Sequence, residues 1–288
     1  MAHPQIAAFA RLADKGQAPV RAIYGQASKL SRTMHDIRYD EVHDEIIVPV
    51  PYGEAILTFR GGADGQEGPI RIMQGPKFGQ IGSRVEVDPI NNEIYVPTST
   101  SIRVFPRGIN GDVAPIRVIE GPDTQLKSAQ SVAVDPVNNI IAVGLNSNFG
   151  TERAGRSNRS GEAGENQPAG AILIFSRTAN GNAKPIGVIR GPNSGIIRIN
   201  QIQVYPQRKL IVAAQPGVGD QMEPPGAFLG VWSETDNGDV PPLWKLPVGE
   251  RTKLKKPFGV VLNPKDKEVI ISDMRNQGIL VFSVPEIF

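Results

Sequence analysis

The segment Ala171-Ile-Leu-Ile-Phe-Ser176 recurs along the chain, followed after a short turn by copies of Lys184-Pro-Ile-Gly-Val-Ile-Arg-Gly-Pro192. Clear copies of the first segment are Ala55-Ile-Leu-Thr-Phe-Arg60, Ser101-Ile-Arg-Val-Phe-Pro106 and Gly278-Ile-Leu-Val-Phe-Ser283, with weaker copies at 5–10 and 227–232. Their short length and β-branched residues predict strands. We call the first segment strand C and the second strand D. The proline of strand D lacks an N–H group and suits the outer edge of a sheet.

Two further apolar runs precede each later copy of strand C, as in Val85-Glu-Val-Asp88 followed by Glu93-Ile-Tyr-Val96. We call these runs strands A and B. Linkers of the Asp-Pro-x-Asn-Asn type supply the turn between them. The repeating unit is therefore a four-stranded antiparallel sheet. Because such a sheet cannot bury both faces alone, we expect an all-β fold in which the copies are the blades of a β-propeller.

The copies comprise five A–B pairs, six C strands and five D strands, which favours five blades and leaves six as the alternative. With five blades, the C-terminal A-B-C trio at 258–283 is completed by the N-terminal D strand at 18–24. That pairing removes a sheet edge. The C-like strand at 5–10 then has no assigned place. We expect one domain over residues 1–288, with a long loop at 145–170 that is either functional or a mobile insertion.

Two stretches of the sequence resemble the NHL repeat, whose blades read Ile-Tyr-Val-Ala-Asp and then Arg-Ile-Gln-Val-Phe. They are Glu93-Ile-Tyr-Val-Pro97 with Ser101-Ile-Arg-Val-Phe105, and Val269-Ile-Ile-Ser-Asp-Met-Arg-Asn-Gln-Gly-Ile-Leu-Val-Phe282. The resemblance covers almost the whole chain and implies a propeller of this type, but no particular activity. The chain departs from the pattern because the Asp after strand B is kept only at Asp273, and the Asn-x-Arg only partly around Asn276.

Composition excludes several classes of function. The chain has no cysteine, hence no disulfide, thiolate metal site or cysteine nucleophile. A net charge of +2 is far from that of a dedicated nucleic-acid binder. No apolar run reaches the roughly 18 residues of a membrane span. No signal peptide is visible, so we expect a cytoplasmic monomer, or a periplasmic or secreted one if a signal has been removed.

The B–C and D–A connections of propeller blades share one face with the mouth of the channel, and the chain concentrates unusual features there. Two B–C connections are enlarged, at 145–170 and 215–226. Polar residues on or before the inner strands are candidates for ligand binding at the channel mouth: Asp36, Arg38, Arg84, Glu86, Asn200, Gln201 and Gln203. Every D–A connection also carries a cation, giving a candidate basic rim of Lys29, Lys77, Lys127, Arg198 and Lys255.

Each set has two interpretations. Asp36, Arg38, Arg84 and Glu86 form either a network that satisfies itself between neighbouring blades or a set that partly contacts a ligand in the channel. The basic rim either focuses a potential that attracts anions or consists of ordinary exposed side chains. The Asn-Gly and Asp-Gly pairs of the C–D turns are interpreted as hairpin turns, because they accept positive φ readily.

Catalytic signatures are sparse, so we expect a non-catalytic binding scaffold without a cofactor. Its partner is a protein, a peptide or an anionic small molecule. The alternative is a calcium-type propeller enzyme, such as a lactonase-like hydrolase or a lyase, with oxygen ligands from Asp36, Glu86, Asn200 and Asp273. Asp36 and Glu86 would also be the carboxylates of a glycosidase. A three-histidine zinc site is implausible, because only His35 of the three histidines lies near the right mouth.

Overall fold

The regular structure of the protein consists of 21 strands and five short 3-10 helices within residues 4–32, 34–146 and 170–288, which this computed structural model describes. The strands follow one another as the repeats predict, so the all-β fold is confirmed. None of the helices among these residues is long and apolar enough to span a membrane.

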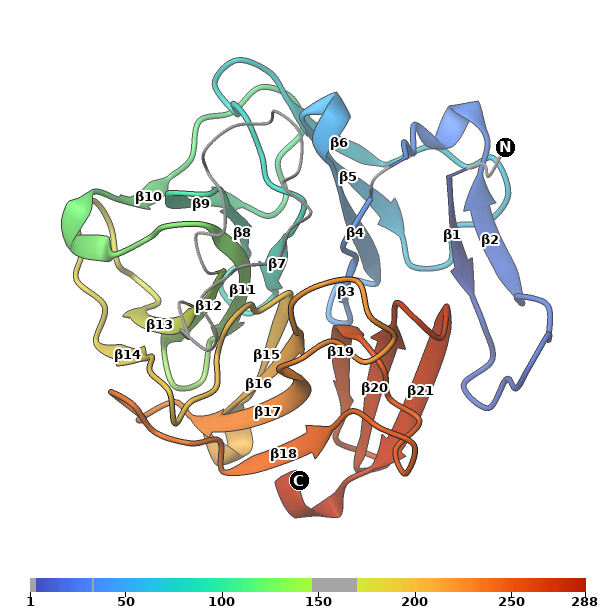
Figure 1. Ribbon diagram of the computed structural model, residues 1–288. Helices are drawn as coiled ribbons and strands as arrows, with labels where there is room; N and C mark the ends of the chain where they lie inside the picture. Colours follow the sequence, from blue (N-terminus) through green and yellow to red (C-terminus); the bar gives the residue numbers. More distant parts are fainter. Residues whose placement is uncertain (1–3, 33, 147–169) are drawn as a thin grey trace. The chain divides into compact units, whose positions relative to one another are not determined.

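Antiparallel sheets of the predicted kind make up the fold (Figure 1). Four of them have four strands each: β3 (Arg38–Asp40), β4 (Glu45–Val50), β5 (Ala55–Arg60) and β6 (Arg71–Gln74); β7 (Glu86–Asp88), β8 (Glu93–Pro97), β9 (Ser101–Pro106) and β10 (Arg117–Glu120); β11 (Ala129–Asp135), β12 (Ile140–Leu145), β13 (Ala171–Ser176) and β14 (Gly187–Ile189); and β15 (Gln201–Tyr205), β16 (Leu210–Pro216), β17 (Ala227–Ser233) and β18 (Trp244–Pro247). A fifth sheet has three strands, β19 (Pro257–Asn263), β20 (Glu268–Asp273) and β21 (Gly278–Ser283). Each of these five sheets contains an A–B pair, and together they are the blades of a five-bladed β-propeller.

The N-terminal strands form a hairpin of their own. β1 (Gln5–Ala8) pairs with β2 (Arg21–Tyr24) in antiparallel register. The C-like segment that had no assigned place in the sequence is therefore the partner of the first D strand, because the two are successive along the chain and close a local hairpin. The predicted closure between this region and the three-stranded C-terminal blade would join two separate units and stays a prediction.

The chain divides into two compact units, Met1–Val96 with Arg103–Arg117, and Pro97–Ile102 with Val118–Phe288. In the first unit, the β3 and β7 strands of successive blades are in contact. In the second unit, β11 contacts β15, and β15 contacts β19. Neighbouring A strands thus lie beside one another, and residues far apart in the sequence share a surface within each unit.

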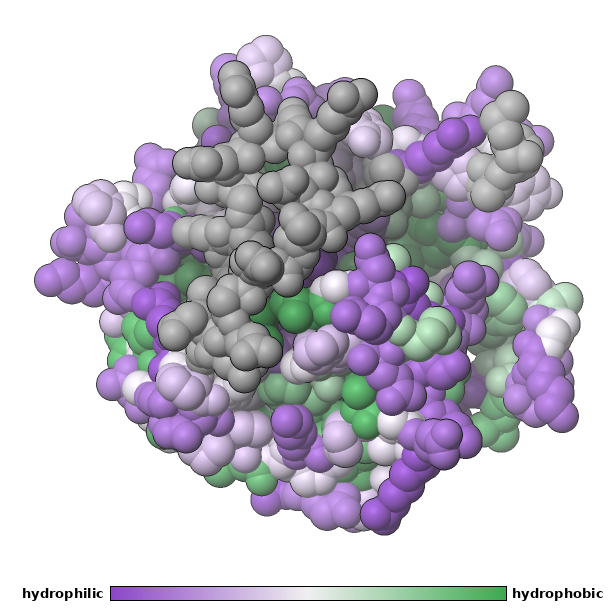
Figure 2. All heavy atoms as spheres, viewed as in Figure 1, coloured by the Kyte–Doolittle hydropathy of each residue, from purple (hydrophilic) through white to green (hydrophobic). Residues whose placement is uncertain are grey.

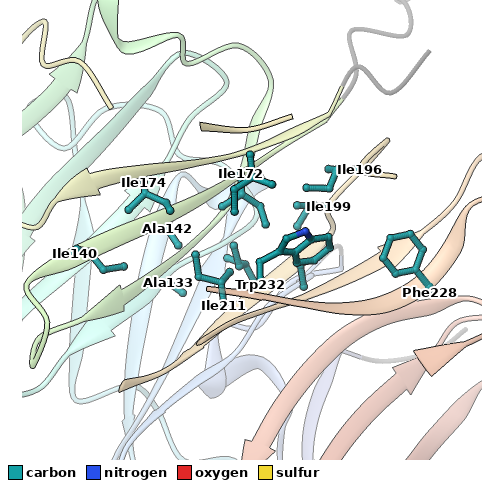
Figure 3. Packing of buried hydrophobic residues seen from close by; sticks show 13 residues of the cluster. Ala133, Ile140, Ala142, Ile172, Ile174, Ile196, Ile199, Ile211, Phe228 and Trp232 are labelled. Atoms are coloured by element: carbon teal, nitrogen blue, oxygen red, sulfur yellow. The ribbon is translucent and has the colours of Figure 1, made fainter. Parts of the chain in front are cut away.

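The core of the second unit lies between blades. The sheet β11–β14 buries Ile172 and Ile174 against Trp232 of the next blade, with Ile196 and Ile199 of the connection between them (Figure 3). All five side chains are at most 1% exposed. Removal of this apolar surface from water is the main favourable contribution to packing one blade on the next.

The A–B turns have the chemistry that the sequence predicts. Asp88 Oδ1 accepts hydrogen bonds from the backbone N–H groups of Ile90 and Asn91, at 3.0 and 2.9 Å. Asp40 and Asp135 make the same two bonds in their own turns. These Asx turns stop strand A and start strand B in the first three blades.

Candidate functional site

A closed charge network joins the first two blades in the first unit. Arg38 on β3 donates from Nη1 to Asp36 Oδ1 at 2.9 Å and from Nε to Glu86 Oε1 at 3.1 Å. All three residues are less than 10% exposed. The second oxygen of Asp36 accepts from Val85 N at 3.1 Å, and Glu86 Oε1 also accepts from Val87 N. One guanidinium thus lies between two carboxylates that are also bonded to the backbone.

Burial governs the ionisation of this network. It raises the pKa of Glu86, and the neighbouring Arg38 offsets that effect only in part. Burial also opposes the charge of Arg38, but Asp36 and Glu86 together raise the pKa of its guanidinium. Partial burial of the imidazole lowers the pKa of His35, and the positive charge of Arg84, which is itself 4% exposed, lowers it further. The geometry is that of the self-satisfying network between blades, and a ligand role for these residues stays a prediction.

The predicted amides of the second unit join β15 to the next blade. Gln201 Oε1 accepts from Val260 N at 2.6 Å, and Asn200 Nδ2 donates to the carbonyl of Phe258, also at 2.6 Å. Gln203 follows Gln201 on the same side of β15 and is partly exposed. Asn200 and Gln201 therefore hold the A strands β15 and β19 of successive blades beside each other.

The cations of the predicted basic rim all lie in D–A connections, as expected. Their environments differ: Lys29, Lys77 and Lys127 are exposed, whereas Arg198 and Lys255 are partly buried. Lys29 and Lys77 belong to the first unit, and the other three belong to the second. A common ring of all five cations around one axis stays a prediction, because the five belong to two different units.

The enlarged B–C connection after β16 is anchored by one side chain, Gln215. Its Oε1 accepts from the backbone N–H groups of Ile197 and Arg198 at 2.6 and 3.2 Å. Its Nε2 donates to the carbonyls of Gly195 and Gly226 at 2.9 and 2.6 Å. Gln215 is 1% exposed and uses both ends of its amide. The D–A connection before β15 and the B–C connection after β16 are therefore fixed to each other. The other enlarged connection, at 145–170, lies outside the described residues except at its two ends.

Asp273 anchors the last blade in the same way. It is the last residue of β20, as Gln215 is the last but one of β16. Its Oδ2 accepts from Lys255 N and Lys256 N at 2.7 and 3.1 Å. Its Oδ1 accepts from Arg275 N and Asn276 N, both at 2.9 Å. Gln215 and Asp273 thus do the same work in successive blades, which makes Arg198 and Lys256 equivalent positions.

Three cations on these anchored connections form what we call the cationic cluster: Arg198, Lys256 and Arg275, in which the charges of both arginines act on Lys256. Lys256 is 5% exposed, and its Nζ donates to the carbonyl of Gly219 at 2.9 Å. Arg275 donates from Nε to the carbonyl of Gln221 at 3.1 Å and also bonds to the carbonyl of Asp220. Burial lowers the pKa of Lys256, and the positive charges of Arg275 and Arg198 lower it further. The surface around these orange-coloured loops of Figure 1 is mostly hydrophilic in Figure 2.

Of the cluster, sequence reasoning selected only Arg198. Lys256 is one of several lysines in its connection, so the sequence does not distinguish it from them. Arg275 lies in a short B–C turn and was not among the residues selected from the sequence. The partly kept Asn-x-Arg pattern after Asp273 was the one signal that pointed there. Burial of a lysine, which is what distinguishes Lys256, is not visible in a single sequence.

The oxygen ligands of the calcium hypothesis are engaged elsewhere. Asp36 and Glu86 bond to Arg38, and Asp273 accepts four backbone N–H groups. Among the described residues there is no group of three or more His, Cys, Asp or Glu side chains that could hold a metal ion. The geometry therefore gives no support to a calcium site built from these residues.

Comparison with known proteins identifies the fold and nothing finer. No protein-family model matches the chain, and no curated protein matches it. Chains of solved structures match in large number (842), so the likeness specifies a common architecture. One is a chain in the crystal structure of a mitotic checkpoint complex, with a TM-score of 0.56 and 12% identity over 93% of this chain. This chain spans 65% of that chain's length.

Proposed function

We propose that this protein is a non-catalytic binding propeller that recognises an acidic segment of a partner protein on the connections of its second unit. The binding surface consists of 191–199, 217–226 and 248–256 together with the turn at 274–277. The blades are of the NHL type in this proposal, on the strength of the pattern between Val269 and Phe282. The similar chain comes from a crystal structure of a protein complex, which agrees with a protein partner.

The observation that carries the proposal is the anchoring of connections that lack regular structure. The side chain of Gln215 forms four hydrogen bonds that fix two connections to one another. The carboxylate of Asp273 accepts another four in the next blade. A surface that is ordered before the partner arrives loses less conformational entropy on binding. Its positive charge favours an acidic partner and speeds the encounter.

The proposal is tested by fluorescence anisotropy with two labelled peptides, oligoglutamate and oligolysine, added to the full chain at low ionic strength. We expect oligoglutamate to bind, oligolysine not to bind, and added salt to weaken the complex. Gln215→Ala removes the anchor and is expected to weaken binding about tenfold through loss of preorganisation. Gln66→Ala, in an exposed C–D turn, is the matched control and leaves affinity unchanged. Absence of oligoglutamate binding, or equal binding of both peptides, would overturn the proposal.

A further inference from the structure

The cationic cluster holds like charges together. The buried carboxylate beside them, Asp273, accepts four backbone N–H groups, those of Lys256 and Arg275 among them. Among the described residues, Asp220 is an acidic side chain whose charge acts on Lys256. It is fully exposed and forms an ion pair with Arg275, with 3.6 Å between its Oδ1 and Nη2 of the arginine. Lys256 itself is bonded to a neutral carbonyl oxygen. Buried cations in proteins are usually paired with an anion, because an unpaired buried charge is costly. The buried ammonium group of Lys256 departs from that rule, because in the described part of the chain it bonds to a carbonyl oxygen and not to a carboxylate.

A second observation points in the same direction. The Nε atom of Arg198 is buried and has no hydrogen-bond partner in the part of the chain that the structure describes. Its backbone N–H, in contrast, is fixed by Gln215. Buried unsatisfied donors are uncommon, and an ion or ligand that belongs there is one of their standard explanations. Here the donor belongs to the same cluster as the ammonium group of Lys256.

The need to fix the 217–226 connection in place does not by itself explain why three cations lie beside it. Lys256 and Arg275 do bond to the carbonyls of Gly219 and Gln221. A neutral donor such as the amide of Gln215, which bonds to Gly226 in the same connection, fastens the loop without mutual repulsion. Holding three mutually repelling cations together costs more free energy than fixing the connection requires, unless an anion is also bound.

We propose that Arg198, Lys256 and Arg275 form a binding subsite for one oxyanion, the carboxylate or phosphate group of a ligand. The inference deepens the proposed function, on which it rests for the identity of the surface. Lysine supplies a compact point charge, and arginine supplies donors whose planar arrangement matches two oxygens of such a group. Binding places negative charge among three positive ones and relieves their repulsion.

The subsite is tested by calorimetric titration of the full chain with inorganic phosphate and, separately, with acetate, at constant ionic strength kept with chloride. We expect one saturable site for phosphate, with weaker binding of acetate if a dianion is preferred. The opposite order assigns the subsite to a carboxylate. Arg198→Gln and Lys256→Met are each expected to weaken the preferred anion about tenfold or more. Lys184→Met, an exposed lysine in a C–D turn, is the matched control and leaves the affinity unchanged.

The ionisation of Lys256 gives a second measurement, which does not depend on either variant folding. NMR titration of the labelled lysine side chain should show that the preferred anion raises the pKa of Lys256, because negative charge favours the ammonium form. A site that binds neither phosphate nor acetate, with the pKa of Lys256 unmoved, overturns the subsite.

The two proposals fail in distinguishable ways. Oligoglutamate that binds equally well to wild type, Arg198→Gln and Lys256→Met overturns the subsite and leaves the binding surface standing. Anion binding without peptide binding keeps the subsite and removes the acidic protein segment as its occupant. Loss of both peptide and anion binding removes both proposals.

Discussion

The carboxyl group of Glu234 lies beside that of Asp135, and both are buried. The same position after strand C holds Arg107 and Arg177 in two other repeats, identified by the shared bond from its N–H to a carbonyl of the A–B turn. Arg107 there approaches Asp40, with 3.5 Å between Nε and Oδ2. Replacing that arginine by glutamate turns an ion pair into a pair of acids.

This acid pair makes the stability of the protein depend on pH. Burial, and then the hydrogen bond and charge of Asp135, raise the pKa of Glu234 from 4.5 to about 8. The folded state therefore binds the proton more tightly than the unfolded state does. Its stabilising effect is complete below about pH 4.5 and is lost as the pH rises through about 8. At about 1.4 kcal/mol for each pKa unit, we expect the free energy of unfolding to fall by about 4–5 kcal/mol over this range.

Urea denaturation at a series of pH values checks this expectation, with Glu234→Gln as the comparison. The glutamine keeps the shape and a hydrogen bond but cannot ionise, so its stability should change less between pH 6 and 9, by about 2 kcal/mol or more. Parallel pH profiles for the two proteins would contradict the assignment of the effect to Glu234.

Arg38 supplies the second prediction at the scale of single residues. Arg38→Met leaves Asp36 and Glu86 buried without their cation, and removal of one partner from a buried network costs about 3–5 kcal/mol. We expect this loss in urea denaturation at neutral pH. The triple variant with Asp36→Asn and Glu86→Gln as well should recover a large part of it. A loss below about 1 kcal/mol in Arg38→Met would show that the network is not structural.

Between elements, the C–D turns have a role beyond reversing the chain. The glycine of each such turn forms a parallel bridge to the D strand of the preceding repeat, at Ile23–Gly65, Met73–Gly111, Ile119–Gly181 and Ile189–Gly238. The Asx residue before the glycine adds a side-chain bond, as from Val118 N to Asn180 Oδ1 at 3.0 Å. Positive φ at Gly181 (61°) allows this approach without strain. Each of these C–D turns is thus bonded to the D strand of the preceding repeat.

Asn180→Ala tests how much the bond from Val118 N to Asn180 Oδ1 contributes to stability. It leaves Val118 N without its acceptor while the glycine and the hairpin remain, and the expected loss in the free energy of unfolding is about 1 kcal/mol. Thr178→Ala, in the exposed part of the same turn, is the control and should change stability by less than about 0.5 kcal/mol. Equal effects of the two substitutions would mean that the bond between blades contributes nothing of its own.

The sequence predicted elements better than contacts. Apolar runs and turn residues are local signals, so strands such as β5 and β13 and the Asx turns at Asp88 and Asp135 were predicted correctly. The partner of a polar side chain is not local. Asn180 was predicted as a turn residue and its bond to the neighbouring repeat was missed. Asp273 is a candidate ligand only in the calcium alternative, and its carboxylate accepts backbone N–H groups instead.

For the molecule as a whole, the propeller fold supports many unrelated functions, so binding and catalysis must be separated by the chemistry of the site. The calcium-enzyme alternative makes a clear thermodynamic demand. An ion that binds only the folded state raises the melting temperature, by an amount that grows with its concentration above Kd. The oxygens of Asp36, Glu86 and Asp273 are already bonded to Arg38 or to the backbone.

We therefore expect millimolar Ca²⁺ to leave the melting temperature of the full chain unchanged relative to Mg²⁺ at equal ionic strength. A rise with Ca²⁺ alone that Asp273→Asn abolishes would revive the enzyme alternative. A rise that survives this substitution would indicate calcium bound elsewhere on the chain.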